Sequence, residues 1–106
     1  MKTCVIESPY AGDVARNMIY LDRCIRWCAE SGWAPYASHK MMTDALDDNK
    51  PDERILGLQC GYAFRRLVGQ RIFFIDYGYS HGMQQAARLY FDEGLSSIEQ
   101  SIGVNP

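Results

Sequence analysis

Three short polar stretches of the sequence contain residue types from which a small-molecule site can be built. They are "ESPYAGD" at residues 7–13, "SHKMM" at 38–42 and "DYGYSHGM" at 76–83. Hydroxyl groups, an imidazole and exposed backbone at glycines are common contacts for sugars and anions. Each stretch follows an apolar segment that is typical of a β-strand. The three stretches therefore predict one binding site, provided that the fold brings these strand ends together.

The apolar pattern predicts strands and helices in alternation. The predicted strands are "KTCVIES" (2–8), "WAPYAS" (33–38) and "RIFFID" (71–76), and the third is an uninterrupted apolar run of the kind found in covered parallel sheets. Helices are predicted from residue 14 to a stop at Gly32, for a turn or two near 40–48, and over 52–68 and 82–93. The tail "LSSIEQSIGVNP" fits either an edge strand or a helical turn.

This alternation predicts an α/β fold, a small open parallel sheet with helices on both faces. We expect one domain over residues 1–106, since the sequence has no internal repeat and is too short for two cores. Ligands of such sheets bind outside the carboxyl ends of the strands. The polar stretches after the three strands are therefore expected to converge on one edge.

Composition narrows the class of protein. Of the 106 residues 47% are hydrophobic and 23% charged, which is typical of a soluble globular domain, and the net charge of -2 gives no reason to expect a nucleic-acid partner. No apolar run approaches membrane-spanning length and no targeting segment is recognisable, so we expect a cytoplasmic protein without a membrane partner. The chain has four cysteines, Cys4, Cys24, Cys28 and Cys60, and we expect them to be buried and reduced, with no metal and no cofactor. The alternative is a metal site that includes His39 or His81, or a disulfide.

Four motifs in order along the chain resemble the nucleoside 2-deoxyribosyltransferase-like family, in particular its compact bacteriophage-type branch. They are "SPYAGD" followed by an asparagine, "G-x-A-P-x-A-x-H", "LDD-x-x-P-x-E-R-x-x-G", and "S-x-G-M" opening a helix. The resemblance covers nearly the whole chain. It implies a flavodoxin-like fold with the first strand between the second and third, a nucleoside or nucleotide ligand, and a homo-oligomer.

The chain departs from this family at the residue that would carry the chemistry. The resemblance places a glutamate nucleophile at the position of Ala86, and a second carboxylate near Gln70. An alanine cannot attack an anomeric carbon, and a glutamine cannot act as an acid or base near neutral pH. The sequence therefore favours a pocket that has lost this chemistry.

Each candidate site residue has a functional and a structural interpretation. Ser8, Tyr10 and Gly12, which follow the first strand, either contact the ribose, base and phosphate of a ligand or simply form a turn. Asn17 either contacts the ligand or caps a loop. Asp47 and Asp48 either bind a ribose diol or cap the following helix. Arg54 either neutralises a phosphate or pairs with these aspartates. The opening of the last helix either binds an anion or is a plain helix start. The predicted ligand-binding set is Ser8, Pro9, Tyr10, Gly12, Asn17, His39, Asp48, Arg54, Ser80, Gly82 and Met83.

Two functions follow from these expectations. The first is a nucleotide-binding protein, for example a phage sponge that sequesters a nucleotide or an ADP-ribose-derived signal of host defence. The second is a nucleoside or nucleotide N-glycosidase or deoxyribosyltransferase with a relocated carboxylate, Asp76 or Asp48. We favour binding, because losing a nucleophile is easier than relocating one. The predicted 52–68 helix has apolar residues on more than one of its faces. This pattern predicts that the helix contacts a second copy of the chain.

Overall fold

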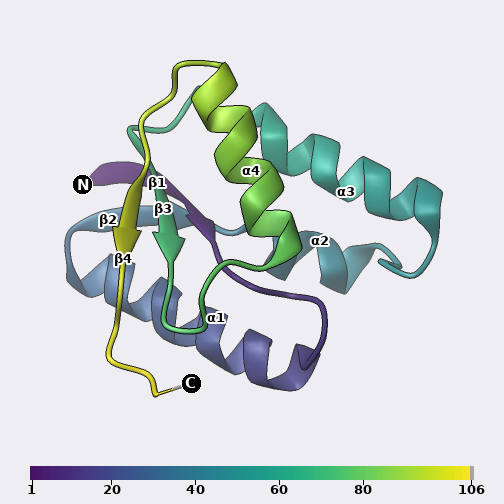
Figure 1. Cartoon of the computed structure of the whole chain (residues 1–106), viewed down its shortest axis with the longest axis horizontal. Coiled ribbons are helices and arrows are strands. Elements are labelled where there is room, and N and C mark those ends of the chain that lie inside the picture. Colours follow the sequence, from purple (N-terminus) through teal and green to yellow (C-terminus); the bar gives the residue numbers. More distant parts are fainter. Residues whose placement is uncertain (106) are drawn as a thin grey trace.

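The computed structural model describes residues 1–105 and contains a parallel sheet of four strands in that range. The strands are β1 (Lys2–Glu7), β2 (Trp33–Tyr36), β3 (Gln70–Phe74) and β4 (Ile98–Gln100), in the order β2-β1-β3-β4 (Figure 1). Every neighbouring pair is parallel. The predicted α/β class and the central place of β1 are confirmed, and the fold is consistent with a small flavodoxin-like arrangement. The tail supplies the edge strand.

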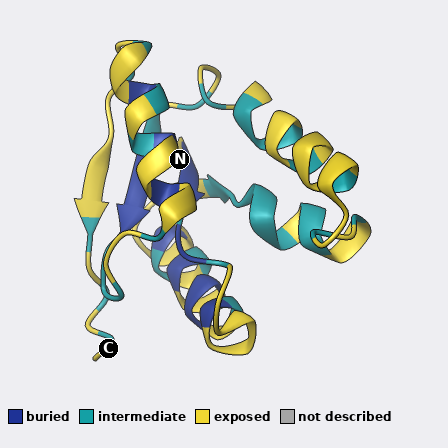
Figure 2. Cartoon of the chain, turned by 45° about the vertical axis from the view of Figure 1, so that its right-hand side comes forward, coloured by how far each residue is buried: buried dark blue, intermediate teal, exposed yellow. Residues whose placement is uncertain are grey.

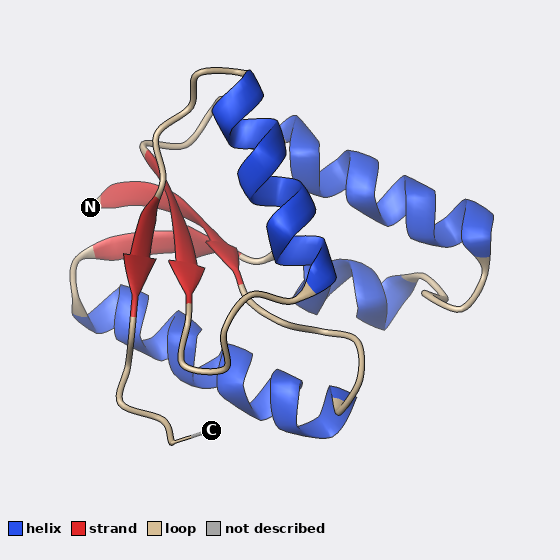
Figure 3. Ribbon diagram, in the orientation of Figure 1, coloured by secondary structure: helices blue, strands red, loops and turns tan. Residues whose placement is uncertain are grey.

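Helices cover both faces of this sheet, as predicted. They are α1 (Val14–Glu30), α2 (Ser38–Ala45), α3 (Pro51–Ala63) and α4 (His81–Asp92). In Figure 3, α1 lies on one face and α4 crosses the other. The start of α1 is fixed by Asp13, whose side chain accepts a hydrogen bond from the Arg16 amide at 3.1 Å. Pro51 occupies the start of α3, where its missing N–H has no cost.

The core has two parts because side chains of β3 alternate between the two faces of the sheet. Ile72 and Phe74 pack with residues of α1, among them Tyr20 and Leu21. Phe73 faces the other way and packs with the α4 side chains: Met83, Ala86 and Tyr90. Three of the cysteines are buried in the first part, as expected: Cys4, Cys24 and Cys28. Cys60 was also expected to be buried, but it lies on α3 outside the core and is only partly buried.

The predicted helix over 52–68 is too long, since α3 ends at Ala63. The guanidinium group of Arg71 is buried and needs acceptors, and it donates to the main-chain oxygens of Arg65 and Val68. It also donates to the main-chain oxygen of Ser96 at 2.6 Å. The chain after Ala63 therefore turns to present carbonyl groups to Arg71 instead of continuing the helix.

We call α2 and α3 with their connection the α2–α3 hairpin (residues 38–63). No residue of this hairpin is fully buried, and none belongs to either part of the core. Figure 2 shows it standing out to one side of the sheet, with mostly exposed and intermediate surface. The hairpin is therefore free to form the wall of a cleft.

Candidate binding cleft

A cleft of about 310 Å³ lies at the carboxyl end of β1, between α4 and the α2–α3 hairpin. Residues of all three predicted polar stretches line it, so these stretches do converge on one edge. The predicted residues that line the cleft are Ser8, Tyr10, His39, Asp48, Arg54, Ser80, Gly82 and Met83. Contact of these residues with a ligand stays a prediction, because the cleft shows only that they share one surface.

Ser8 and His39 connect the first strand end to α2. The Ser8 hydroxyl and Nε2 of His39 form a hydrogen bond of 2.7 Å. Burial lowers the pKa of His39 to about 4, so the imidazole is neutral at pH 7. A neutral imidazole offers hydrogen bonds without adding positive charge, which suits a hydroxyl of a sugar better than a phosphate.

Charged groups lie toward the hairpin end of the cleft. Arg54 Nη1 contacts Asp48 Oδ2 at 3.1 Å, and the neighbouring Glu53 also lines the cleft. Asp47 accepts a hydrogen bond from the Asn49 amide at 3.0 Å and thus acts as a turn residue, in line with the capping interpretation. The predicted pairing of Arg54 with an aspartate is confirmed for Asp48.

The N-terminal end of α4 opens onto the cleft. Ser80 is the N-cap, and its hydroxyl oxygen accepts from the Met83 amide at 3.2 Å. His81 and Gly82 follow in the first turn and also line the cleft. Since the amide groups of a first helical turn point toward the N-terminus, this end of the cleft carries partial positive charge.

Glu7 lines the same cleft and was missed by the sequence analysis. As the last residue of β1 it lies at the carboxyl edge of the sheet, and its Oε2 accepts a hydrogen bond of 2.6 Å from the Tyr90 hydroxyl of α4. Burial raises the pKa of Glu7 to about 7, against the smaller lowering effect of Tyr90. The available signal was a lone carboxylate directly after the apolar run Cys4 to Ile6, at the end of the strand.

Three predicted ligand residues lie outside the cleft. Asn17 is buried, and its side-chain amide donates to the main-chain oxygens of Tyr10 (2.9 Å) and Ala11 (3.1 Å). Asn17 therefore caps the loop, which was the structural alternative considered from the sequence, and it positions Tyr10 indirectly. Pro9 is buried beside this loop, and Gly12 is exposed with φ of +95°, a conformation that favours glycine in a turn.

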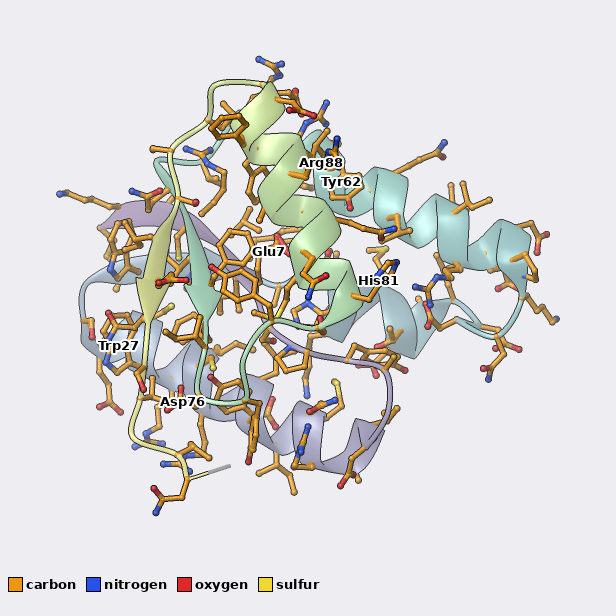
Figure 4. All side chains as sticks on the ribbon, viewed as in Figure 1. Glu7, Trp27, Tyr62, Asp76, His81 and Arg88 are labelled. Carbon is orange, nitrogen blue, oxygen red and sulfur yellow. The ribbon has the colours of Figure 1, made fainter. Side chains whose placement is uncertain are left out.

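Asp76 also lies outside the cleft, which argues against it as a relocated catalytic acid. Its carboxylate accepts hydrogen bonds from the Tyr20 hydroxyl (2.6 Å), the Ser101 hydroxyl (2.8 Å) and the Val104 amide (2.9 Å). Burial opposes ionisation, but these bonds together with the Ile102 amide outweigh it and lower the pKa of Asp76 to about 2. Asp76 anchors the C-terminal tail below the sheet (Figure 4).

The two positions at which the family resemblance places carboxylates also lie outside the cleft. Ala86 is buried in the core with Phe73, Met83 and Tyr90. Gln70 is the first residue of β3 and therefore lies at the amino end of that strand, opposite the cleft. Neither Ala86 nor Gln70 lines the cleft itself, although Met83 and Tyr90, which pack with Ala86, do.

The fold and the cleft define a small α/β protein with a cleft at the carboxyl edge of its sheet. Residues 2–97 match the model of a family described as "Domain of unknown function (DUF7768)", and the chain belongs to this family. No curated protein and no solved structure matches it. Over the part of the chain that the structure describes, no helix is long and apolar enough to cross a membrane, and no group of three or more His, Cys, Asp or Glu could hold a metal ion.

Proposed function

We propose that this protein binds a small nucleotide in the cleft. The observation that carries the proposal is the meeting of an aromatic ring, sugar-binding groups and a helix N-terminus on one lining: Tyr10, then Ser8 with His39, then Ser80 to Met83. These are the groups that contact the base, the sugar and a phosphate, respectively. The resemblance to nucleoside 2-deoxyribosyltransferases supports the same ligand class.

The charges of the cleft favour a ligand with few phosphates. Glu7, Asp48 and Glu53 line it together with one arginine, Arg54, which is already paired with Asp48. Two or three phosphate groups would meet more carboxylates than cations at close range. A nucleoside monophosphate, with its phosphate at the α4 N-terminus, fits this lining best.

In this proposal the biological role is sequestration. A phage-type domain that holds a nucleotide, or an ADP-ribose-derived signal of host defence, needs affinity and no turnover. The absence of the family's glutamate at Ala86 supports such a role.

The experiment is calorimetry of the full chain with nucleoside monophosphates, diphosphates and ADP-ribose, joined to mass spectrometry of small molecules released by denaturation. We expect binding of monophosphates, and Tyr10→Ala should weaken it by about 1–3 kcal/mol, the range for a stacking aromatic. Tyr79→Ala is the matched control, because Tyr79 does not line the cleft. Absence of binding by every nucleotide tested, at millimolar concentration, would overturn the proposal.

A second candidate function is cleavage of the N-glycosidic bond. Of the two relocated carboxylates considered from the sequence, Asp76 lies outside the cleft and Asp48 is paired with Arg54. One observation nevertheless favours this function: Glu7 brings a carboxyl group into the cleft from β1.

A further inference from the structure

Glu7 differs from the other carboxylates of the cleft because it has no cation beside it. Asp48 is paired with Arg54 at 3.1 Å. Oε2 of Glu53 lies 3.6 Å from Nζ of Lys50. Over residues 1–105 no lysine, arginine or histidine forms an ion pair with Glu7. The cleft therefore holds a carboxylate whose charge no neighbouring cation balances.

The surroundings of Glu7 are aromatic. Tyr90 of α4 donates its hydroxyl to Glu7 Oε2 at 2.6 Å, and two further tyrosines line the same cleft. These are Tyr62 of α3 and Tyr10 of the loop after β1, and both are partly exposed. Figure 4 shows Glu7 and Tyr62 on either side of α4. Phenol rings attract cations through their electron-rich faces, so a carboxylate among them suits an organic cation.

We infer that the nucleotide of this cleft has a positively charged base, such as a pyridinium or an N-alkylated purine, and that Glu7 is its counter-ion. This inference rests on the proposed function, because the nucleotide must first occupy the cleft, and it names the class of nucleotide. It requires affinity without turnover and therefore agrees with sequestration.

The charge of the whole lining supports a cationic base. Within residues 1–105, three carboxylates and one arginine line the cleft: Glu7, Asp48, Glu53 and Arg54. The phosphate of a nucleoside monophosphate adds a charge of about −1.5 to −2 at pH 7. A positive base offsets part of this charge, and its attraction to a partly desolvated carboxylate is stronger than that between fully exposed ions. A cationic base therefore makes a monophosphate compatible with a lining rich in carboxylates.

The protonation of Glu7 makes this preference depend on pH. Burial raises the pKa of Glu7 to about 7, against the smaller lowering effect of Tyr90. Only the ionised carboxylate attracts a cation. The affinity for a cationic base should therefore be complete above about pH 8 and fall about tenfold between pH 8 and pH 6.

Groups on the elements around Glu7 keep their charge over this range. Tyr90 of α4 and Tyr62 of α3 stay neutral, because burial raises the pKa of both phenols. Arg71 of β3 is a buried cation bonded to main-chain oxygens, and His39 of α2 is neutral with a pKa of about 4. The other charged or titratable side chains of the lining stay the same in the variants below: Asp48, Glu53, Arg54 and His81.

The test compares two forms of one nucleotide that differ in the charge of the base. They are nicotinamide mononucleotide, whose ring is a pyridinium, and its reduced form, whose ring is neutral. Calorimetry of the full chain at pH 8 should show that the oxidised form binds at least about tenfold more tightly. Adenosine monophosphate, which has a neutral base, should bind about as weakly as the reduced form.

Glu7→Gln keeps the shape of the side chain and removes its charge. This variant should lose the preference for the oxidised form, and with it the part of the pH dependence between pH 6 and pH 8 that the ligand phosphate does not cause. Glu99→Gln is the matched control. Glu99 also accepts a hydrogen bond of 2.6 Å from a tyrosine hydroxyl, that of Tyr79, but it lies on β4 and does not line the cleft.

A second variant keeps the inference testable if Glu7→Gln does not fold. Tyr90→Phe removes a hydrogen bond that favours the Glu7 carboxylate, so it should move the loss of affinity for the oxidised form to higher pH, which a packing defect alone would not do. If the unmodified protein binds the oxidised form no more tightly than the reduced form, the inference is overturned and the proposed function stands. A preference that persists in Glu7→Gln overturns the role of Glu7, and failure of every nucleotide to bind overturns both.

Discussion

Ala86 fills a place in the core between α4 and the sheet, where Phe73, Met83 and Tyr90 surround it. Restoring the family's glutamate by Ala86→Glu should therefore disturb this packing first. A carboxylate buried there without a partner is expected to cost about 2–4 kcal/mol of folding free energy. Urea denaturation measures this loss, with Gln84→Glu on the exposed face of α4 as the control. Unchanged stability of Ala86→Glu would contradict this placement.

Asp76 makes the C-terminal tail sensitive to acid. Its pKa in the folded protein is about 2, below the ordinary value of 3.8, so its stabilising effect is complete above about pH 4 and disappears as the pH falls toward 2. Since the side chain is partly exposed, we expect Asp76→Asn to lower stability by about 1–2 kcal/mol at pH 6. The difference from the unmodified protein should shrink at pH 2, and a constant difference would show that charge has no part in it.

At the scale of elements, α2 and α3 approach closely at Gly61. A Cβ atom there would lie 2.5 Å from Ser38 Oγ and 2.9 Å from Ser38 Cβ, closer than packed atoms allow. Gly61→Ala should therefore move α2 away from α3 and weaken nucleotide binding about tenfold, with a loss of stability of about 1–3 kcal/mol. Binding should return in the double variant with Ser38→Gly. If the single variant binds normally, the spacing of the two helices does not shape the cleft.

The elements were predictable to the extent that apolar periodicity determines them. The alternation around α1 and the apolar run of β3 identified the sheet, its direction and the convergence of the polar stretches. The end of α3 was not predictable, because it depends on a buried guanidinium, Arg71, that takes main-chain oxygens from the following turn. The surroundings of Asp76 and Glu7 were not predictable for a related reason: whether a carboxylate at a strand end faces the cleft or the tail depends on tertiary contacts, here Tyr90 and Ser101.

At the scale of the whole molecule, the outer surface of α3 predicts self-association. Ile55 is 56% exposed and Leu56 48%, and Leu67, beyond the end of α3, is 76% exposed. We expect light scattering to give a mass that is a multiple of 12.1 kDa at micromolar concentration. Ile55→Glu with Leu56→Glu should shift the protein toward the monomer, whereas Ile19→Glu on α1 should not. A mass of one chain for the unmodified protein at that concentration would refute this.

The α2–α3 hairpin is continuous in the chain and contributes no side chain to either part of the core. Residues 38–63 can therefore diverge, or be exchanged between members of the family as a block, without a matching change in the sheet or in α1. A chimera that carries another member's hairpin should fold as readily as its parent and acquire the part of the donor's ligand preference that the hairpin lining determines. Selection for a new ligand can thus act on this quarter of the chain without disturbing the packing of the sheet.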